Sequence, residues 1–102
     1  MIIGNAISLN MLPPCGQGEW NTIDRTLAQE LAEDCESCIG HADMAAVITD
    51  DLGVFVECNR KSVSLEIGDT MLVCQYKGPR LQEGAVSLPE GAKIEYVLFS
   101  VV

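Results

Sequence analysis

The chain contains one histidine, His41, in the stretch SCIGHADMAAVI. The spacing Cys35-x2-Cys38-x2-His41 provides three soft ligands of the kind that zinc prefers, and Cys58 is available as a fourth. However, there is no second C-x-x-C pair, and residues 36–40 alternate like a short buried strand, in which cysteine behaves as a small hydrophobic residue. A thioredoxin-like site would need its cysteine pair at a helix N-terminus. The pattern therefore favours packing over metal binding or redox chemistry.

Three further groups of polar residues lie where the apolar pattern gives them no role in a core. One group follows the first apolar segment, one lies in mid-chain and one in a late loop: Asn5, Ser8 and Asn10; Asn59 and Arg60; Arg80 and Glu83. Guanidinium groups bind phosphate oxygens in bidentate fashion, and histidine changes charge near neutral pH. These residue types are compatible with an anion site, although single histidines, turn asparagines and surface arginines are also common without one.

Length and composition predict a single domain, residues 1–102, with a real core. The chain is 48% hydrophobic, and its apolar runs fall well short of the roughly 20 residues that cross a bilayer. The opening MIIGNAISLN is apolar but lacks a basic leader, so it resembles a strand more than a secretion signal. We expect a cytoplasmic protein without membrane association, in which the five cysteines are free thiols.

The charge balance limits the partners. Six basic and fifteen acidic residues give a net charge of -9, which opposes general affinity for duplex nucleic acid or anionic lipid. A small anion site remains compatible with this charge, because salt screens a diffuse surface potential within about 10 Å.

The first half of the chain predicts strands and two helices. Residues 2–8 are β-prone, residues 9–18 form a loop rich in proline and glycine, and residues 19–24 are compatible with a short strand. A capping box at Thr26-Leu27-Ala28-Gln29 predicts a helix that ends near Asp34. Residues 42–52 repeat the helical period, and Gly53 follows where a C-terminal cap favours glycine, so His41 lies at the start of this helix.

The second half of the chain changes to a strand period. Residues 62–76 predict a hairpin that turns at Gly68-Asp69, and residues 94–102 predict a final strand. The long loop between them is rich in glycine and proline, as functional or disordered loops often are. Because the strands and helices do not alternate regularly, we expect an α+β fold with a mixed, roughly five-stranded sheet and helices on one face.

Three blocks of the sequence, IIGNAISLNML, CIGHADMAAVITDDLGVFVECNR and QYKGPRLQEG, resemble the small ring-nuclease family of type III anti-CRISPR proteins from archaeal viruses, phages and CRISPR loci. The blocks occur in the same order over nearly the whole chain, with residues 13–36 the least similar. The resemblance implies a homodimer of α+β subunits that binds cyclic tetra-adenylate at the dimer interface. It further implies cleavage to linear di-adenylates without a metal or other cofactor, in the host cell cytoplasm if the protein is viral.

The resemblance also implies roles for individual residues. His41 is the general acid that protonates the departing 5′-oxygen when the ribose 2′-hydroxyl attacks phosphorus. Arg80 stabilises the dianionic phosphorane, and Glu83 orients Arg80 or His41 or helps to activate the 2′-hydroxyl. The residues expected to bind the ligand are Asn5, Ser8, Asn10, Arg60 and Gln75. The stretch QYKGPR has one residue more between Gln75 and Arg80 than some archaeal-virus members.

In the homodimer that the resemblance implies, one histidine per chain suffices for two cuts. A cyclic tetranucleotide has two equivalent diagonal phosphates, and a two-fold dimer presents one His41 to each of them. The alternatives are a non-catalytic dimer that sequesters the messenger, a viral regulator without turnover and, as a weaker hypothesis, a Cys/His zinc protein.

Overall fold

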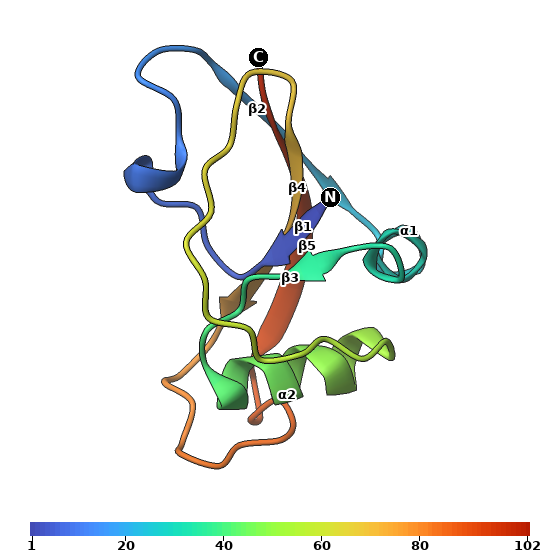
Figure 1. Cartoon of the computed structure of the whole chain (residues 1–102). Coiled ribbons are helices and arrows are strands. Elements are labelled where there is room, and N and C mark those ends of the chain that lie inside the picture. Colours follow the sequence, from blue (N-terminus) through green and yellow to red (C-terminus); the bar gives the residue numbers. More distant parts are fainter.

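The computed structural model describes residues 1–102 and confirms an α+β fold (Figure 1). A 3-10 turn at Leu9–Met11 accompanies five strands and two helices: β1 Ile2–Gly4, β2 Gly18–Ile23, α1 Arg25–Ala32, β3 Glu36–Ser37, α2 Ala42–Leu52, β4 Thr70–Lys77 and β5 Lys93–Val101. No helix is long and apolar enough to span a bilayer.

The five strands form one mixed sheet in the order β2-β5-β4-β1-β3. β1 pairs in parallel with β3 and β4, whereas β5 runs antiparallel to both β2 and β4. The carboxyl ends of β1, β3 and β4 therefore meet at one edge of the sheet. The segments that follow these three strands carry most of the polar residues singled out above.

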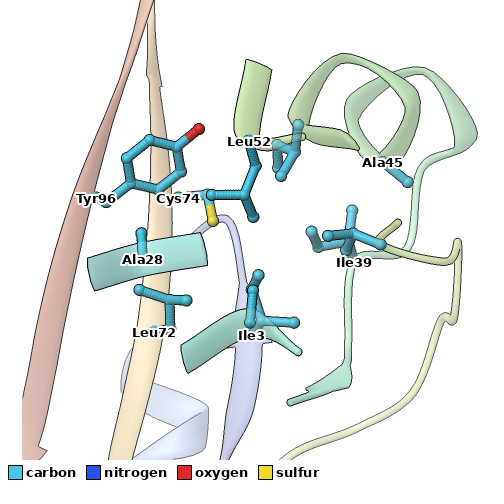
Figure 2. Packing of buried hydrophobic residues seen from close by; sticks show 11 residues of the cluster. Ile3, Ala28, Ile39, Ala45, Leu52, Leu72, Cys74 and Tyr96 are labelled. Carbon is cyan, nitrogen blue, oxygen red and sulfur yellow. The ribbon is translucent and has the colours of Figure 1, made fainter. Parts of the chain in front are cut away.

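Both helices pack on the same face of the sheet, as predicted. Side chains from α1 and α2 meet alternate residues of the strands in one buried cluster, which includes Ile3, Ala28, Ala45, Leu52, Leu72, Cys74 and Tyr96 (Figure 2). The opposite face is covered by irregular chain. There Leu65 packs with Met71, Val73 and Val101, and partly buried residues of the segment after β1 complete the cluster.

The predicted hairpin at residues 62–76 is wrong. β4 pairs with β1 and β5, and residues 62–67 are irregular chain lying outside the sheet. The apolar alternation of this stretch reflects one-sided packing of an extended segment at Val63 and Leu65, whereas Ile67 is exposed. The N–H of Leu65 donates to the carbonyl of Met11 at 2.7 Å. Period-2 burial requires a surface to pack on, but it does not require a pairing strand.

The helix ends agree with the prediction in one case and differ in the other. Gly53 caps α2 with φ 77°, a left-handed conformation that glycine adopts without a steric penalty. The predicted capping box at Thr26 is wrong: α1 begins at Arg25, and the side chain of Asp24 accepts a hydrogen bond from the N–H of Leu27 at 2.8 Å. Aspartate and threonine both favour this position, so local sequence does not separate the two starts.

Candidate functional site

The chain leaves β1 and β3 toward opposite faces of the sheet. After β1 it continues into the irregular segment on the open face, and after β3 it enters α2 on the helix face. Neighbouring parallel strands whose connections diverge in this way create a crevice at their carboxyl ends, where ligands of open sheets commonly bind. Asn5 directly follows β1 and His41 comes four residues after the end of β3, so both lie beyond the carboxyl ends of these strands.

His41 is the N-cap residue of α2. Its side chain is exposed and makes no capping hydrogen bond, while its carbonyl accepts from the N–H of Ala45 at 3.0 Å. The first-turn amides of Ala42, Asp43 and Met44 donate to no protein acceptor. Free amides at the positive end of a helix favour a bound anion, and the imidazole of His41 lies beside these amides.

Arg60 is held close to His41 by backbone pairing. The N–H of Asn59 donates to the carbonyl of Ile39, and its side-chain amide donates to the carbonyl of Ser37, both at 2.8 Å. These bonds place the Arg60 side chain directly over Gly40, where an added Cβ would lie 3.1 Å from Arg60 Cγ. The glycine before His41 thus allows the close approach of the arginine.

The hydroxyl of Ser37 links the segment before His41 to the segment before Arg60. This buried hydroxyl donates to the carbonyl of Glu57 at 2.8 Å and accepts from the N–H of Ile39 at 3.1 Å.

We expect Ser37→Ala to lower the free energy of unfolding by about 1–3 kcal/mol, because it leaves a buried amide without a partner. Urea denaturation measures the loss. Ser87→Ala is the control, since Ser87 is exposed and its hydroxyl makes no hydrogen bond. Equal midpoints for the two variants would contradict the prediction.

Three predicted ligand-binding residues line one hollow of about 340 Å³ on the open face, namely Asn5, Ser8 and Asn10. Lys61 lines the same hollow and was missed by the sequence analysis. Its ammonium group pairs with the carboxylate of Glu36 at 2.5 Å, and the bond and charge of this lysine hold the pKa of Glu36 below its usual range. The one feature of the sequence that could have suggested Lys61 as a site residue is its position directly after Arg60.

Arg80 and Glu83 lie on the loop of residues 78–92, which joins β4 to β5 (orange in Figure 1). Both side chains are exposed and line a second hollow of about 430 Å³. The loop reaches α2 through a hydrogen bond of 3.1 Å from the N–H of Gly84 to Asp43 Oδ1. This contact brings the loop to the helix turn that begins at His41.

Gln75 lies apart from this group. It is exposed on β4 opposite Glu95 of β5 and, by alternation with Cys74, faces away from the helices. More generally, no hydrogen bond or ion pair joins any two of the eight predicted site residues within one chain. The sheet edge gathers the sequence segments, but their functional groups are not joined by hydrogen bonds or ion pairs within the chain.

The basic residues divide according to whether they have a partner. Five of the six lie near the candidate site. Residues 60 and 61 are on the segment beside His41, residue 80 is in the loop of residues 78–92, and residues 77 and 93 are at the strand ends that flank this loop. Lys61, Lys77 and Lys93 each pair with a glutamate, and Arg25 pairs with Asp51. Only Arg60 and Arg80 have no carboxylate within 4.0 Å, and neither does His41. In a chain of charge -9, these unpaired side chains are free to meet an anion.

The cysteines are placed for packing. Cys35 packs against the cluster on the helix face, with its thiol donating to the carbonyl of Leu31 at 3.2 Å, whereas Cys38 packs against the cluster on the open face. No three histidine, cysteine or acidic side chains gather into an arrangement that would hold a metal ion. The zinc hypothesis for Cys35, Cys38, His41 and Cys58 therefore has no support in the geometry.

Burial also sets the reactivity of the thiols. Burial, with smaller contributions from Cys35 and Asp51, raises the pKa of the Cys74 thiol to about 12. An unfolded thiol ionises near pH 8.5, so above this pH the folded form retains a proton that the unfolded chain releases. The stabilisation from Cys74 is therefore present below about pH 8.5 and is lost toward pH 12.

We expect alkylation at pH 9 to modify the exposed Cys15 and Cys58 and to spare Cys74 until denaturant is added. Mass spectrometry of the peptides checks this, and rapid labelling of Cys74 in the folded protein would contradict it.

Comparison with known proteins identifies similarities over nearly the whole chain. A sequence model of the family described as STIV B116-like matches residues 1–98. Among solved structures, B116 of Sulfolobus turreted icosahedral virus, a viral protein, superimposes with a TM-score of 0.77 at 27% sequence identity, covering 97% of each chain. No curated protein matches the sequence. The matched region includes His41, the Arg60 segment and the loop of residues 78–92.

Proposed function

The chain belongs to the STIV B116-like family, and from this membership and the site geometry we propose that it is a metal-independent ring nuclease. Its substrate is cyclic tetra-adenylate, which it cleaves to linear di-adenylates, so that type III CRISPR signalling is switched off or evaded. The observation that carries the proposal is the set of three exposed side chains without a carboxylate partner, His41, Arg60 and Arg80. A proton donor and two guanidinium groups are what cleavage of a phosphodiester without a metal requires.

The mechanism uses the ribose 2′-hydroxyl as an internal nucleophile. Its oxygen forms a bond to phosphorus, the bond from phosphorus to the 5′-oxygen breaks, and His41 gives its proton to the departing oxygen. Arg60 and Arg80 neutralise the charge that builds up on the phosphorane, and the free amides at the start of α2 bind a phosphate oxygen. Glu83 either accepts the 2′-hydroxyl proton itself, or it orients Arg80, its neighbour on the loop, while a solvent water accepts that proton.

The full site is proposed to form between two chains. Within one chain the predicted residues line separate hollows, with Asn5, Ser8 and Asn10 in one and Arg80 and Glu83 in another. A cyclic tetranucleotide placed on a two-fold axis meets one His41 from each protomer at its two diagonal phosphates. Both cuts then use the same chemistry, and the products are two equal di-adenylates.

The acidic surface supports selectivity for a small ring. The excess of acidic residues repels long polyanions, while Arg60 and Arg80 act over the short distance of a closed site. Cleavage of long linear RNA at a rate comparable to that of the ring would contradict this part of the proposal.

The test is turnover of labelled cyclic tetra-adenylate, in excess over protein, with and without a chelator. Multiple turnovers that are unaffected by the chelator support the proposal. Binding without cleavage would instead identify a protein that sequesters the messenger, and loss of cleavage on chelation would revive the zinc hypothesis. Sedimentation of the protein tests the dimer separately.

A further inference from the structure

The loop of residues 78–92 is closed at its base. The hydroxyl of Tyr76 donates to the carbonyl of Pro79, and an added Cβ at Gly78 would lie only 2.9 Å from Ala92 Cα. With φ 158° and this close approach, Gly78 allows the two ends of the loop to meet. The base thus fixes where the loop starts and ends, but none of its hydrogen bonds involves Arg80 or Glu83.

A single hydrogen bond ties the tip of the loop to the rest of the fold. The N–H of Gly84 donates to Asp43 Oδ1 at 3.1 Å, and no other residue between 80 and 91 is hydrogen-bonded to anything outside the loop. Asp43 has no further partner, because it forms no ion pair and does not cap its own helix. Its half-buried carboxylate is therefore dedicated to this one contact.

The position of Asp43 is otherwise unfavourable for the proposed activity. It lies in the first turn of α2, two residues after His41, where a negative charge opposes a bound phosphate. The same charge strengthens its bond to the Gly84 amide, since hydrogen bonds to a carboxylate are roughly twice as strong as neutral ones. The hydrogen bond between Asp43 and Gly84 therefore offsets the repulsion that the Asp43 carboxylate exerts on a bound phosphate.

We propose that Asp43 is a positioning residue that docks the tip of the loop on α2 and holds Arg80 and Glu83 on the same side of the sheet edge as His41. This inference rests on the proposed ring-nuclease function. A loop already docked before the ligand arrives loses less conformational entropy on binding, so the contact acts on substrate affinity.

The first test is hydrogen exchange of the free protein, which needs no activity. We expect Asp43→Ala to accelerate exchange of the Gly84 amide by at least about tenfold, the factor that loss of one hydrogen bond to a charged group implies. Asp43→Asn removes the same charge from the helix end but retains an acceptor oxygen, so it should exchange more slowly than Asp43→Ala. Asp50→Ala is the matched control, because Asp50 is an exposed aspartate of the same helix without a partner. Unchanged exchange in Asp43→Ala would overturn the proposal.

The second test separates KM from kcat. If the loop is docked in only a fraction of the free protein molecules, the apparent affinity for substrate equals the affinity of the docked form multiplied by that fraction. We therefore expect Asp43→Ala to raise KM about tenfold, the factor expected for the lost hydrogen bond, with kcat nearly unchanged, and Asp43→Asn to restore KM. A faster enzyme, or a loss in kcat alone, would overturn the proposal. If the wild type cleaves nothing, the ring-nuclease function fails, while the exchange result still decides whether Asp43 docks the loop.

Discussion

Replacing His41 by alanine is expected to slow cleavage of cyclic tetra-adenylate at least about 100-fold, because a positioned general acid contributes about 10²- to 10⁴-fold. Binding of the ring should change much less. The contacts assigned to Arg60, Arg80 and the first-turn amides of α2 do not involve the imidazole. Single-turnover kinetics measures the first quantity, and equilibrium titration with the labelled ring measures the second.

The structure makes this substitution interpretable. The His41 side chain is exposed and makes no hydrogen bond, and the carbonyl that receives the Ala45 amide is retained in any variant. His41→Asn provides a second variant, since asparagine is a preferred N-cap residue and its side chain does not act as an acid near neutral pH. Both variants should fold and bind but cleave poorly. Wild-type cleavage by either one would remove His41 from the mechanism.

Loss of either unpaired arginine is expected to have the next largest effect. Arg60→Ala and Arg80→Ala should each lower kcat/KM by about 100-fold, the lower end of the cost of removing one group that stabilises transition-state charge. Lysine at either position should recover only part of the activity, because an ammonium group does not reproduce bidentate contact with phosphate. Initial rates at several substrate concentrations measure the effect.

Arg25 is the matched control for both variants. It is an exposed arginine of α1 that pairs with Asp51, in the last turn of α2. Asp51 lies ten positions after His41 along the helix, a distance of about 15 Å at 1.5 Å per residue. Arg25→Ala should leave kcat/KM close to wild type. An equal loss in all three variants would indicate a general effect of net charge and contradict the assignment of Arg60 and Arg80.

Strong local signals made much of the fold predictable. The helical period of residues 42–52 and the glycine at 53 fixed α2, which placed His41 at its N-terminus as observed. The β-branched and aromatic C-terminal segment forms β5. The mixed sheet and the shared face of both helices also agree with the prediction.

Other features depend on tertiary contacts that local sequence does not encode. Residues 62–67 alternate like a strand but pack on the sheet as irregular chain, because the places beside β4 are taken by β1 and β5. The antiparallel partner of β4, β5, follows only after the loop of residues 78–92, and hydrophobic pattern alone does not select between near and distant partners.

The candidate site divides in the same way. Residue types suggested His41, Arg60 and Arg80 as candidates, and the structure places Asn5, Ser8 and Asn10 around one hollow. Lys61 and Asp43 were not predicted because their contacts are with residues distant in sequence, Glu36 and Gly84. Gln75 was selected by resemblance; it lies on β4 opposite Glu95 and lines neither of the two hollows.

The proposed activity is tested most directly by the chemical identity of the products. Cyclic tetra-adenylate is incubated with the wild-type protein in the presence of a chelator, and the products are resolved by mass spectrometry. Attack by the 2′-hydroxyl predicts linear di-adenylates that carry a 2′,3′-cyclic phosphate. An intact ring, or products that end in a 5′-phosphate, would contradict a metal-independent ring nuclease with His41 as its acid.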